Sequence, residues 1–416
     1  MTPALTRKVT SGPGLNSAAH RAWLGSHARQ LLAFYAGSAD RDGGGFGILG
    51  DTGLRIPGPK HAYRTARMTY CFALGVLLGH EQCAELVSHG LSALRTIFHD
   101  DRSGGWFATV SADGREVVTP GKQTYAHAFV LLAASAAAQA GFGCDDLLGE
   151  ATELFDTRLY DRDARLCLDS FDRDWRHCDP YRGMNANMHA VEALLVAHAA
   201  TGDEARLRCA ADIAGRLIDF AAASRWRIPE HFTADWDPVP DYNRDRPADK
   251  FRPFGATPGH SLEWARLLLQ LRLAGCGPSA RLLAAAQALF ARALADAWDA
   301  DRCGFAYTVD WDGREVIDLR LHWPLAEAIG AAQYLSDATG QAMYASWYDT
   351  FWAVARHRFI DRRNGSWQHE LSTDGTASST ICSGRPDLYH ALTATISGIA
   401  GPSPSLPLRL REPGAR

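Results

Sequence analysis

Apolar residues recur at helical spacing along most of this chain. In most of these segments they stand at positions i, i+3, i+4 and i+7, the pattern of a helix with a buried face. Turns such as 200–203 (Ala-Thr-Gly-Asp) end one helix before the next begins. The pattern predicts twelve helices, at residues 18–35, 62–79, 83–98, 123–141, 145–158, 186–200, 204–223, 260–274, 279–298, 321–338, 342–358 and 386–399.

A second kind of segment separates the pairs of helices. Small and aromatic residues alternate in it, and an Asp-Gly turn often follows, as at Asp113-Gly114, Asp312-Gly313 and Asp374-Gly375. Alternation closed by Asp-Gly is typical of a short β-hairpin. Copies begin near residues 43, 104, 165, 230, 303 and 365, about sixty to seventy residues apart.

Six repeated helix pairs predict an all-α fold, an (α/α)6 barrel in which an outer ring of helices surrounds an inner ring, with short β-hairpins at one face. An open solenoid is the alternative. The first and last helices are ordinary amphipathic helices without the polar outer face of a solenoid cap, which favours closure. We expect one catalytic domain over residues 1–400 and a Pro-rich disordered tail over residues 401–416.

Composition narrows the possible partners and location. The chain has 416 residues, of which 46% are hydrophobic, enough to form a large hydrophobic core. Its net charge of -4 gives no excess of basic residues with which to bind nucleic acid. The nine cysteines include no C-x-x-C pair and indicate reduced thiols. The first twenty residues lack the apolar core of a signal peptide, and no apolar run is long enough to span a membrane. We expect a cytoplasmic protein that binds neither membranes nor nucleic acids.

Each predicted inner helix begins with polar or aromatic residues before it becomes apolar. In a closed barrel these six starts converge on one mouth, where arginines, histidines and glutamates would line one pocket. A single buried histidine more often has a structural role. Polar residues at the equivalent position of all six inner helices favour a functional site instead. The starts are Tyr63 to Arg67, Tyr125 to His127, Asn185 to His189 with Glu192, His260 with Glu263 and Trp264, His322 to Pro324 with Glu327, and Asp387 to His390.

The stretch Thr257-Pro258-Gly259-His260 is the clearest of these starts. His260 and Glu263 are three residues apart, so they share one face of the helix. The chain has no H-E-x-x-H metal motif, no G-x-S-x-G nucleophile motif, no P-loop and no dinucleotide fingerprint. The chemistry that these residues still allow is proton transfer by histidine and glutamate. Histidine can accept and donate protons near neutral pH.

These segments together resemble the N-acylglucosamine 2-epimerase superfamily. The resemblance extends from about Trp23 to the last helix. Within the superfamily, the chain is most similar to the mannose and sulfoquinovose isomerases. No single motif carries it. The matching segments are 65–68, 104–106, 122–129, 185–192, 257–264, Trp323-Pro324 with Glu327, 365–367 and Asp387 with Tyr389-His390.

The resemblance implies an aldose–ketose isomerase that needs neither a metal nor a cofactor and acts on a monosaccharide, D-mannose with D-fructose, or D-lyxose with D-xylulose. It implies that His260 and His390 are the acid/base pair. We assign His390 to proton transfer between C1 and C2 and His260 to ring opening, although the two roles could be exchanged. The residues expected to bind substrate are Arg67, His127, Asn187, His189, Glu192, Glu263, Trp323, Glu327, Trp367, His369 and Asp387.

The sequence departs from the sulfoquinovose isomerases where they bind a sulfonate. Lys250 stands where an arginine is expected, and His369 and Pro386 stand where glutamines are expected. An ammonium lacks the planar fork of a guanidinium, so these changes favour a neutral sugar. Sulfoquinovose isomerase, a 2-epimerase of N-acylglucosamine or cellobiose, and an (α/α)6 glycoside hydrolase remain alternatives. A segment over 229–258 could cover a monosaccharide pocket, whereas a disaccharide epimerase would need an open cleft.

Overall fold

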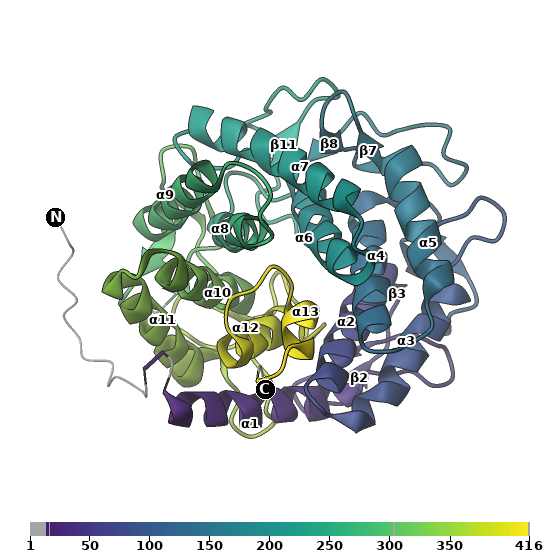
Figure 1. The fold of residues 1–416 in the computed structure, drawn as a ribbon, viewed down its shortest axis with the longest axis horizontal. Coiled ribbons are helices and arrows are strands. Elements are labelled where there is room, and N and C mark those ends of the chain that lie inside the picture. Colours follow the sequence, from purple (N-terminus) through teal and green to yellow (C-terminus); the bar gives the residue numbers. More distant parts are fainter. Residues whose placement is uncertain (1–13, 16, 303, 415–416) are drawn as a thin grey trace.

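Two concentric rings of helices form the body of the protein (Figure 1). The computed structural model describes residues 14–15, 17–302 and 304–414. The inner ring consists of α2 (Ala62–Leu77), α4 (Thr124–Gln139), α6 (Met184–Thr201), α8 (Pro258–Leu273), α10 (His322–Thr339) and α12 (Tyr389–Ala400). The outer ring consists of α1 (Ala18–Ala36), α3 (Ala84–Arg95), α5 (Asp145–Leu154), α7 (Glu204–Ala223), α9 (Ser279–Ala297) and α11 (Ala342–Val354). The predicted (α/α)6 barrel is confirmed.

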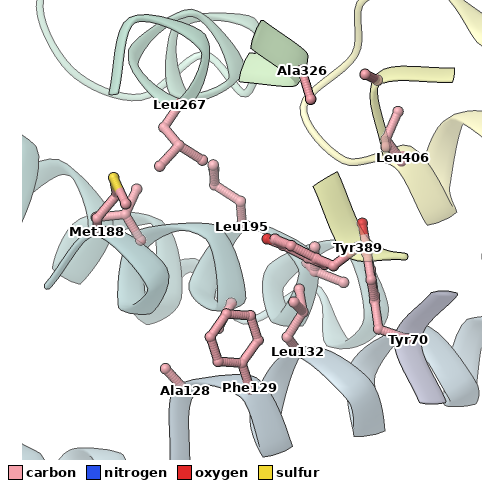
Figure 2. Close-up of a cluster of buried hydrophobic side chains, with 14 of the residues drawn as sticks. Tyr70, Ala128, Phe129, Leu132, Met188, Leu195, Leu267, Ala326, Tyr389 and Leu406 are labelled. Carbon is pink, nitrogen blue, oxygen red and sulfur yellow. The ribbon is translucent and has the colours of Figure 1, made fainter. Parts of the chain in front are cut away.

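The inner helices are buried on nearly every side. In α8, the residues from Ser261 to Leu271 are all buried. A helix surrounded by other helices is apolar all round, whereas an outer helix such as α9 buries only one stripe. Side chains from the inner ring meet at its centre, where Figure 2 shows Tyr70, Phe129, Leu195 and Leu267 facing one another.

Short turns of other helix types extend three outer segments. A 3-10 turn, η1 (Glu81–Cys83), precedes α3. The π-helical turns η2 (Phe155–Leu159) and η3 (Ala355–Phe359) continue α5 and α11. Their end residues Phe155, Leu159, Ala355 and Phe359 are buried, so these turns carry the chain from the outer helix into the core of the next hairpin.

A ring of backbone pairings joins the starts of the inner helices. The residues just before each inner helix pair with the hairpin of the following repeat. Four pairings join β3 (Lys60–His61) to β4 (Thr109–Val110), β6 (Lys122–Gln123) to β9 (Ser170–Phe171), β10 (Arg182–Gly183) to β11 (His231–Phe232), and β16 (Arg320–Leu321) to β17 (Glu370–Leu371). Single bridges Ala256–Val309 and Leu49–Arg385 supply the other two. The Leu49–Arg385 bridge joins the first repeat to the last, so the barrel is closed and is not a solenoid.

Hairpins project outside this ring. They pair β1 (Ile48–Leu49) with β2 (Arg55–Ile56), β7 (Tyr160–Asp161) with β8 (Leu166–Cys167), β12 (Trp298–Asp299) with β13 (Gly304–Phe305), β14 (Thr308–Val309) with β15 (Glu315–Ile317), and β4 with β5 (Val117–Thr119). Gly114 and Gly313 have φ angles of 73° and 85°, which explains the predicted Asp-Gly turns.

The tail differs from the expectation of disorder. Residues Leu406–Arg411 form a helix, α13, which packs against α2, α6 and α12. Leu406 and Leu410 are buried and face the barrel, and Pro407 is tolerated because it lies in the first turn. Tyr334 donates to the carbonyl of Ser403 (2.9 Å) near the end of α10, so α13 closes the barrel at the carboxyl ends of the inner helices. The prediction of disorder rested on the proline content of the tail. It did not take into account that Leu406 and Leu410, four residues apart, form the apolar face of a short helix.

No helix within the described ranges combines the length and the apolar character that a membrane span requires. The expectation that the first twenty residues hold no signal peptide falls largely on residues 1–13 and 16, which lie outside the described part of the chain.

Candidate active site

A pocket, here called the central pocket, opens where the inner helices begin. Its cavity volume is about 110 Å³. Eight of the residues predicted for the site line it, and the segment before α8 contributes Lys250, Phe251 and Pro253. The predicted residues in its lining are Arg67, His189, His260, Glu263, Trp323, His369, Asp387 and His390.

His390 is held by a carboxylate behind it. Its Nδ1 donates to Oε1 of Glu327 at 2.8 Å, and Oε2 of Glu327 accepts from Nε of Arg266 at 2.9 Å. All three side chains are buried. Burial, reinforced by the charge of Arg67, lowers the pKa of His390 well below its usual value. The ring is therefore neutral near pH 7, and its Nε2 is the nitrogen left to accept a proton from a substrate.

His260 has a carboxylate partner of its own. Its Nδ1 donates to Oε1 of Glu230 at 2.9 Å. The indole of Trp323 packs against both histidines, with ring centroids 5.2 Å from His260 and 5.6 Å from His390. One flat apolar surface thus contacts two oriented imidazoles. Glu230 was not among the predicted site residues, because nothing in a sequence pairs a hairpin glutamate with a histidine thirty residues later.

Arg67 brings a fixed positive charge to the lining of the central pocket. Its Nη2 donates to the hydroxyl of Tyr125 at 2.7 Å, and its Nη1 lies 3.4 Å from Oδ2 of Asp387. The guanidinium also lies over the rings of Phe129 (4.3 Å) and Tyr389 (4.8 Å). Burial opposes ionisation of Asp387, but Arg67 and the other basic groups around it together outweigh burial, and the pKa of Asp387 is lowered. Arg67 is therefore rigidly placed to face a developing negative charge.

Three carboxylates surround Arg266 beneath the central pocket. Besides Glu327, its guanidinium lies 3.5 Å from Glu192 and 3.5 Å from Glu263. Burial and the neighbouring Glu327 raise the pKa of Glu263 well above its usual value, which favours its protonated form. His189 lies 3.7 Å from Glu192 and 3.8 Å from Glu263, and burial lowers its pKa to about 4.

The same groups come close to metal-ligand geometry. His189, Glu192 and Glu263 form one such cluster, and Glu263, Glu327 and His390 form another. Arg266 already supplies a cation to all three carboxylates.

Arg266 was not among the residues predicted from the sequence. It stands three residues after Glu263 within an apolar run, and that spacing places both on one helix face.

Two further histidines contact each other in the lining of the central pocket. The rings of His322 and His369 have centroids 3.8 Å apart. The Nδ1 of His322 donates to the carbonyl of His369 at 3.3 Å, and Nε2 of His369 contacts the hydroxyl of Tyr35 at 3.0 Å. Burial lowers the pKa of both histidines. The neutral Nε2 of His322 has no hydrogen-bond partner among the described residues, so it can accept one from a ligand hydroxyl.

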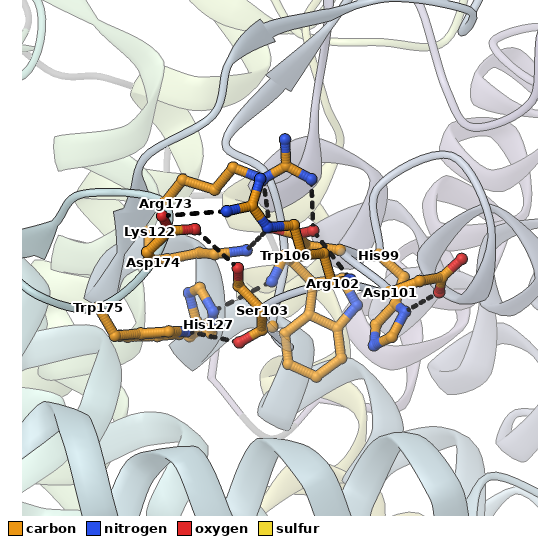
Figure 3. Close-up of polar contacts among 12 residues, drawn as sticks. His99, Asp101, Arg102, Ser103, Trp106, Lys122, His127, Arg173, Asp174 and Trp175 are labelled. Atoms are coloured by element: carbon orange, nitrogen blue, oxygen red, sulfur yellow. Dashed lines mark hydrogen bonds and ion pairs between the residues drawn. The ribbon is translucent and has the colours of Figure 1, made fainter.

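Five predicted binding residues lie outside the lining of the central pocket, and three of them bond to other parts of the fold. His127 accepts from the backbone N–H of Trp106 at 3.2 Å and donates to the carbonyl of Gln123 at 2.8 Å; Figure 3 shows it between Trp106 and Trp175. Asn187 bonds both backbone groups of Cys167. Trp367 donates to His27 at 2.8 Å. Each side chain holds a hairpin or an outer helix in place. The other two, Glu192 and Glu327, lie behind the lining and act on it through His189 and His390.

Residues 44–394 match the N-acylglucosamine 2-epimerase (GlcNAc 2-epimerase) family. The chain belongs to this family. Two D-mannose isomerases are relatives with high coverage. The one from Pseudomonas cannabina pv. alisalensis is 42% identical over 94% of this chain and 95% of its own. The one from Thermobifida fusca is 44% identical over 94% of this chain and 96% of its own.

Solved structures of the epimerase family share the fold. A crystal structure of a D-mannose isomerase superposes with a TM-score of 0.86 at 31% identity, over 93% of this chain and 99% of that chain. A cellobiose 2-epimerase from Spirochaeta thermophila superposes with a TM-score of 0.81 at 22% identity, over 93% of this chain and 98% of that chain. At that lower identity the likeness concerns the fold alone.

Proposed function

We propose that this protein is an aldose–ketose isomerase that interconverts D-mannose and D-fructose, and that it also accepts D-lyxose and D-xylulose. Relatives named D-mannose isomerase match almost its whole length at 42% and 44% identity. The observation that carries the proposal is the pair His260 and His390, each donating from Nδ1 to its own buried glutamate beside one indole. A reaction that moves protons between neighbouring carbons and oxygens needs two such groups.

In this proposal His390 moves the carbon-bound proton. Its neutral Nε2 takes the proton from C2 of the open-chain aldose, and the C–H electrons form the C1–C2 double bond as the aldehyde oxygen becomes an enediolate oxygen. The imidazolium then returns the proton to C1, while the hydroxyl on C2 passes its proton to the enediolate oxygen on C1, so that C2 becomes the ketone carbon and C1 carries a hydroxyl. Arg67 faces the negative charge that develops on the oxygens. No atom is gained or lost in the cycle.

His260 serves the oxygen side of the reaction. It moves a proton between the anomeric hydroxyl and the ring oxygen when the pyranose opens. Glu230 keeps its Nδ1 protonated, so Nε2 is available to accept a proton and return it. Glu263, whose raised pKa favours a protonated carboxyl, can donate a hydrogen bond to a sugar hydroxyl. Metal-free chemistry is part of the proposal.

The pocket lining favours a neutral monosaccharide. Its cavity is small, about 110 Å³. Lys250 is a lone ammonium at its edge, and the neighbouring His369 is neutral because burial lowers its pKa well below the usual value. A sulfonate would find no guanidinium fork at Lys250, whereas hydroxyls can bond to neutral imidazoles.

The test uses EDTA-treated protein in D₂O with mannose, fructose, lyxose, glucose, cellobiose and sulfoquinovose, followed by NMR. We expect mannose to give fructose, with deuterium entering the sugar at carbon. Glucose from mannose without fructose would replace the proposal with a 2-epimerase, and a requirement for added metal would remove its metal-free mechanism. His390→Asn should abolish both turnover and deuterium exchange at C2, whereas His260→Asn should abolish turnover of the closed pyranose.

A further inference from the structure

A second cavity, here called the side chamber, adjoins the central pocket. Its volume is about 430 Å³, and it is lined by the strands before α2, α4 and α6 and by the turn 249–252. Tyr63, Tyr125, Asn185 and Phe251 line both cavities, so the two spaces share a wall. The proton transfers proposed above make no use of the side chamber.

The turn 249–252 divides the two spaces. Oδ1 of Asp249 accepts from the backbone N–H groups of Phe251 (3.0 Å) and Arg252 (2.9 Å), which fixes the turn. Lys250 lines only the central pocket, Arg252 lines only the side chamber, and Phe251 lines both. The side chain of Phe251 therefore belongs to the partition between them.

The ring of Phe251 forms part of the wall between the two cavities and makes few contacts with other side chains. Its ring meets the edge of Tyr63 at 5.9 Å and of Tyr125 at 6.1 Å, and 44% of the residue is exposed. The fold does not depend on a side chain so exposed, and shortening it removes a wall without opening the core.

The side chamber has the chemistry of a site for an uncharged ring with hydroxyls. Three charged residues line it, and each is bonded within the protein. Arg252 donates to Oδ2 of Asp169 at 3.1 Å and lies 3.7 Å over the ring of Tyr181, and Asp249 accepts from the backbone of its own turn. Aromatic faces and uncharged hydrogen-bonding groups such as Gln123 complete the lining. Oδ1 of Asn185, in the shared wall, has no hydrogen-bond partner among the described residues.

We propose that the side chamber is a binding site for the second residue of a neutral disaccharide, and that Phe251 closes it off and so restricts the enzyme to monosaccharides. The reducing-end sugar occupies the central pocket, and its neighbour would occupy the space beyond Phe251. This inference rests on the proposed isomerase function for its catalytic readout. Its binding readout does not.

The test compares wild type, Phe251→Ala and Phe251→Tyr on mannose and on 2-, 3-, 4- and 6-linked mannobioses. With Phe251→Ala we expect the ratio of kcat/KM for one of the 3-, 4- or 6-linked disaccharides to that for mannose to rise on the order of tenfold or more, with a keto-disaccharide as product. Phe251→Tyr keeps the ring and should keep the wild-type ratio. The 2-linked disaccharide is an internal control, because its C2 oxygen cannot become a ketone.

A second variant locates the added sugar. Thr119→Trp fills the side chamber from β5, so in the Phe251→Ala background it should lower the disaccharide-to-mannose ratio again. Saturation-transfer NMR with the same mannobioses measures binding without turnover. If folded Phe251→Ala binds none of them more tightly than wild type, the inference is overturned. If wild type fails to isomerise mannose, the proposed function fails, and the binding comparison still decides the role of the side chamber.

Discussion

The Nδ1 of His390 donates to Oε1 of Glu327 at 2.8 Å, and the opposite oxygen of that carboxylate accepts from Arg266 at 2.9 Å. The guanidinium orients the carboxyl group of Glu327, and the bond from Nδ1 to this carboxyl group fixes which nitrogen of His390 carries the proton. His260 has a comparable partner in Glu230, and among the residues that the structure describes no arginine hydrogen-bonds to that carboxylate. The two imidazoles therefore differ in how firmly their tautomer is fixed, and His390 is the more firmly held.

Glu327→Gln should lower kcat on the order of 10²-fold or more with a smaller change in KM, because the amide can present its N–H to His390 and stabilise the wrong tautomer. Steady-state kinetics on mannose measures both constants.

Glu150→Gln is the matched control, since Glu150 lies 3.0 Å from Nε2 of His99 outside the central pocket. It should keep wild-type kinetics. Equal losses in the two variants would mean that Glu327 acts only through the fold.

Acid should destabilise the protein between about pH 6.5 and pH 4. Burial lowers the pKa of His127 to about 4, and its Nε2 must stay unprotonated to accept from Trp106. The unfolded chain binds a proton at about pH 6.5, so the free energy of unfolding falls as pH drops below that value, by on the order of 2 kcal/mol at pH 5 for this one group.

His127→Gln removes this titration. Urea unfolding should give the variant a lower stability than wild type at pH 7.5 and a difference smaller by about 2 kcal/mol at pH 5. An unchanged difference at the two pH values would show that His127 is protonated in the folded state.

Leu410→Ala should lower the free energy of unfolding by on the order of 2–5 kcal/mol, because the side chain is 0% exposed where α13 closes the barrel. Arg411→Ala, at the next and exposed position, should stay within about 0.5 kcal/mol of wild type. Denaturant titration compares the two. Similar stabilities would mean that α13 contributes little to the barrel.

The sequence was sufficient to predict the rings of helices and the mouth of the barrel, because hydrophobic spacing and Asp-Gly turns are local signals. It was less reliable for side-chain direction. Residues two apart on a helix project to nearly opposite sides. His127 therefore faces away from the central pocket when Tyr125 faces it, and the same relation separates Asn187 from His189.

Local sequence patterns do not predict which side chains meet when separate segments of the chain pack together. Glu230 directly precedes β11, which pairs with β10 before α6, and its carboxylate accepts from His260 at the start of α8. The dividing role of Phe251 likewise depends on where Asp249 turns the chain.

The bridge between Leu49 and Arg385 also bears on biosynthesis. Arg67 comes from the first inner helix, whereas Asp387 and His390 come from the last, and they meet across this seam. A ribosome must therefore release almost the entire chain before these groups can assemble. Prematurely terminated products lack the proton-transfer pair even if most of their helices form, and a fragment ending before α12 should regain activity only when the missing helix is supplied as a separate polypeptide.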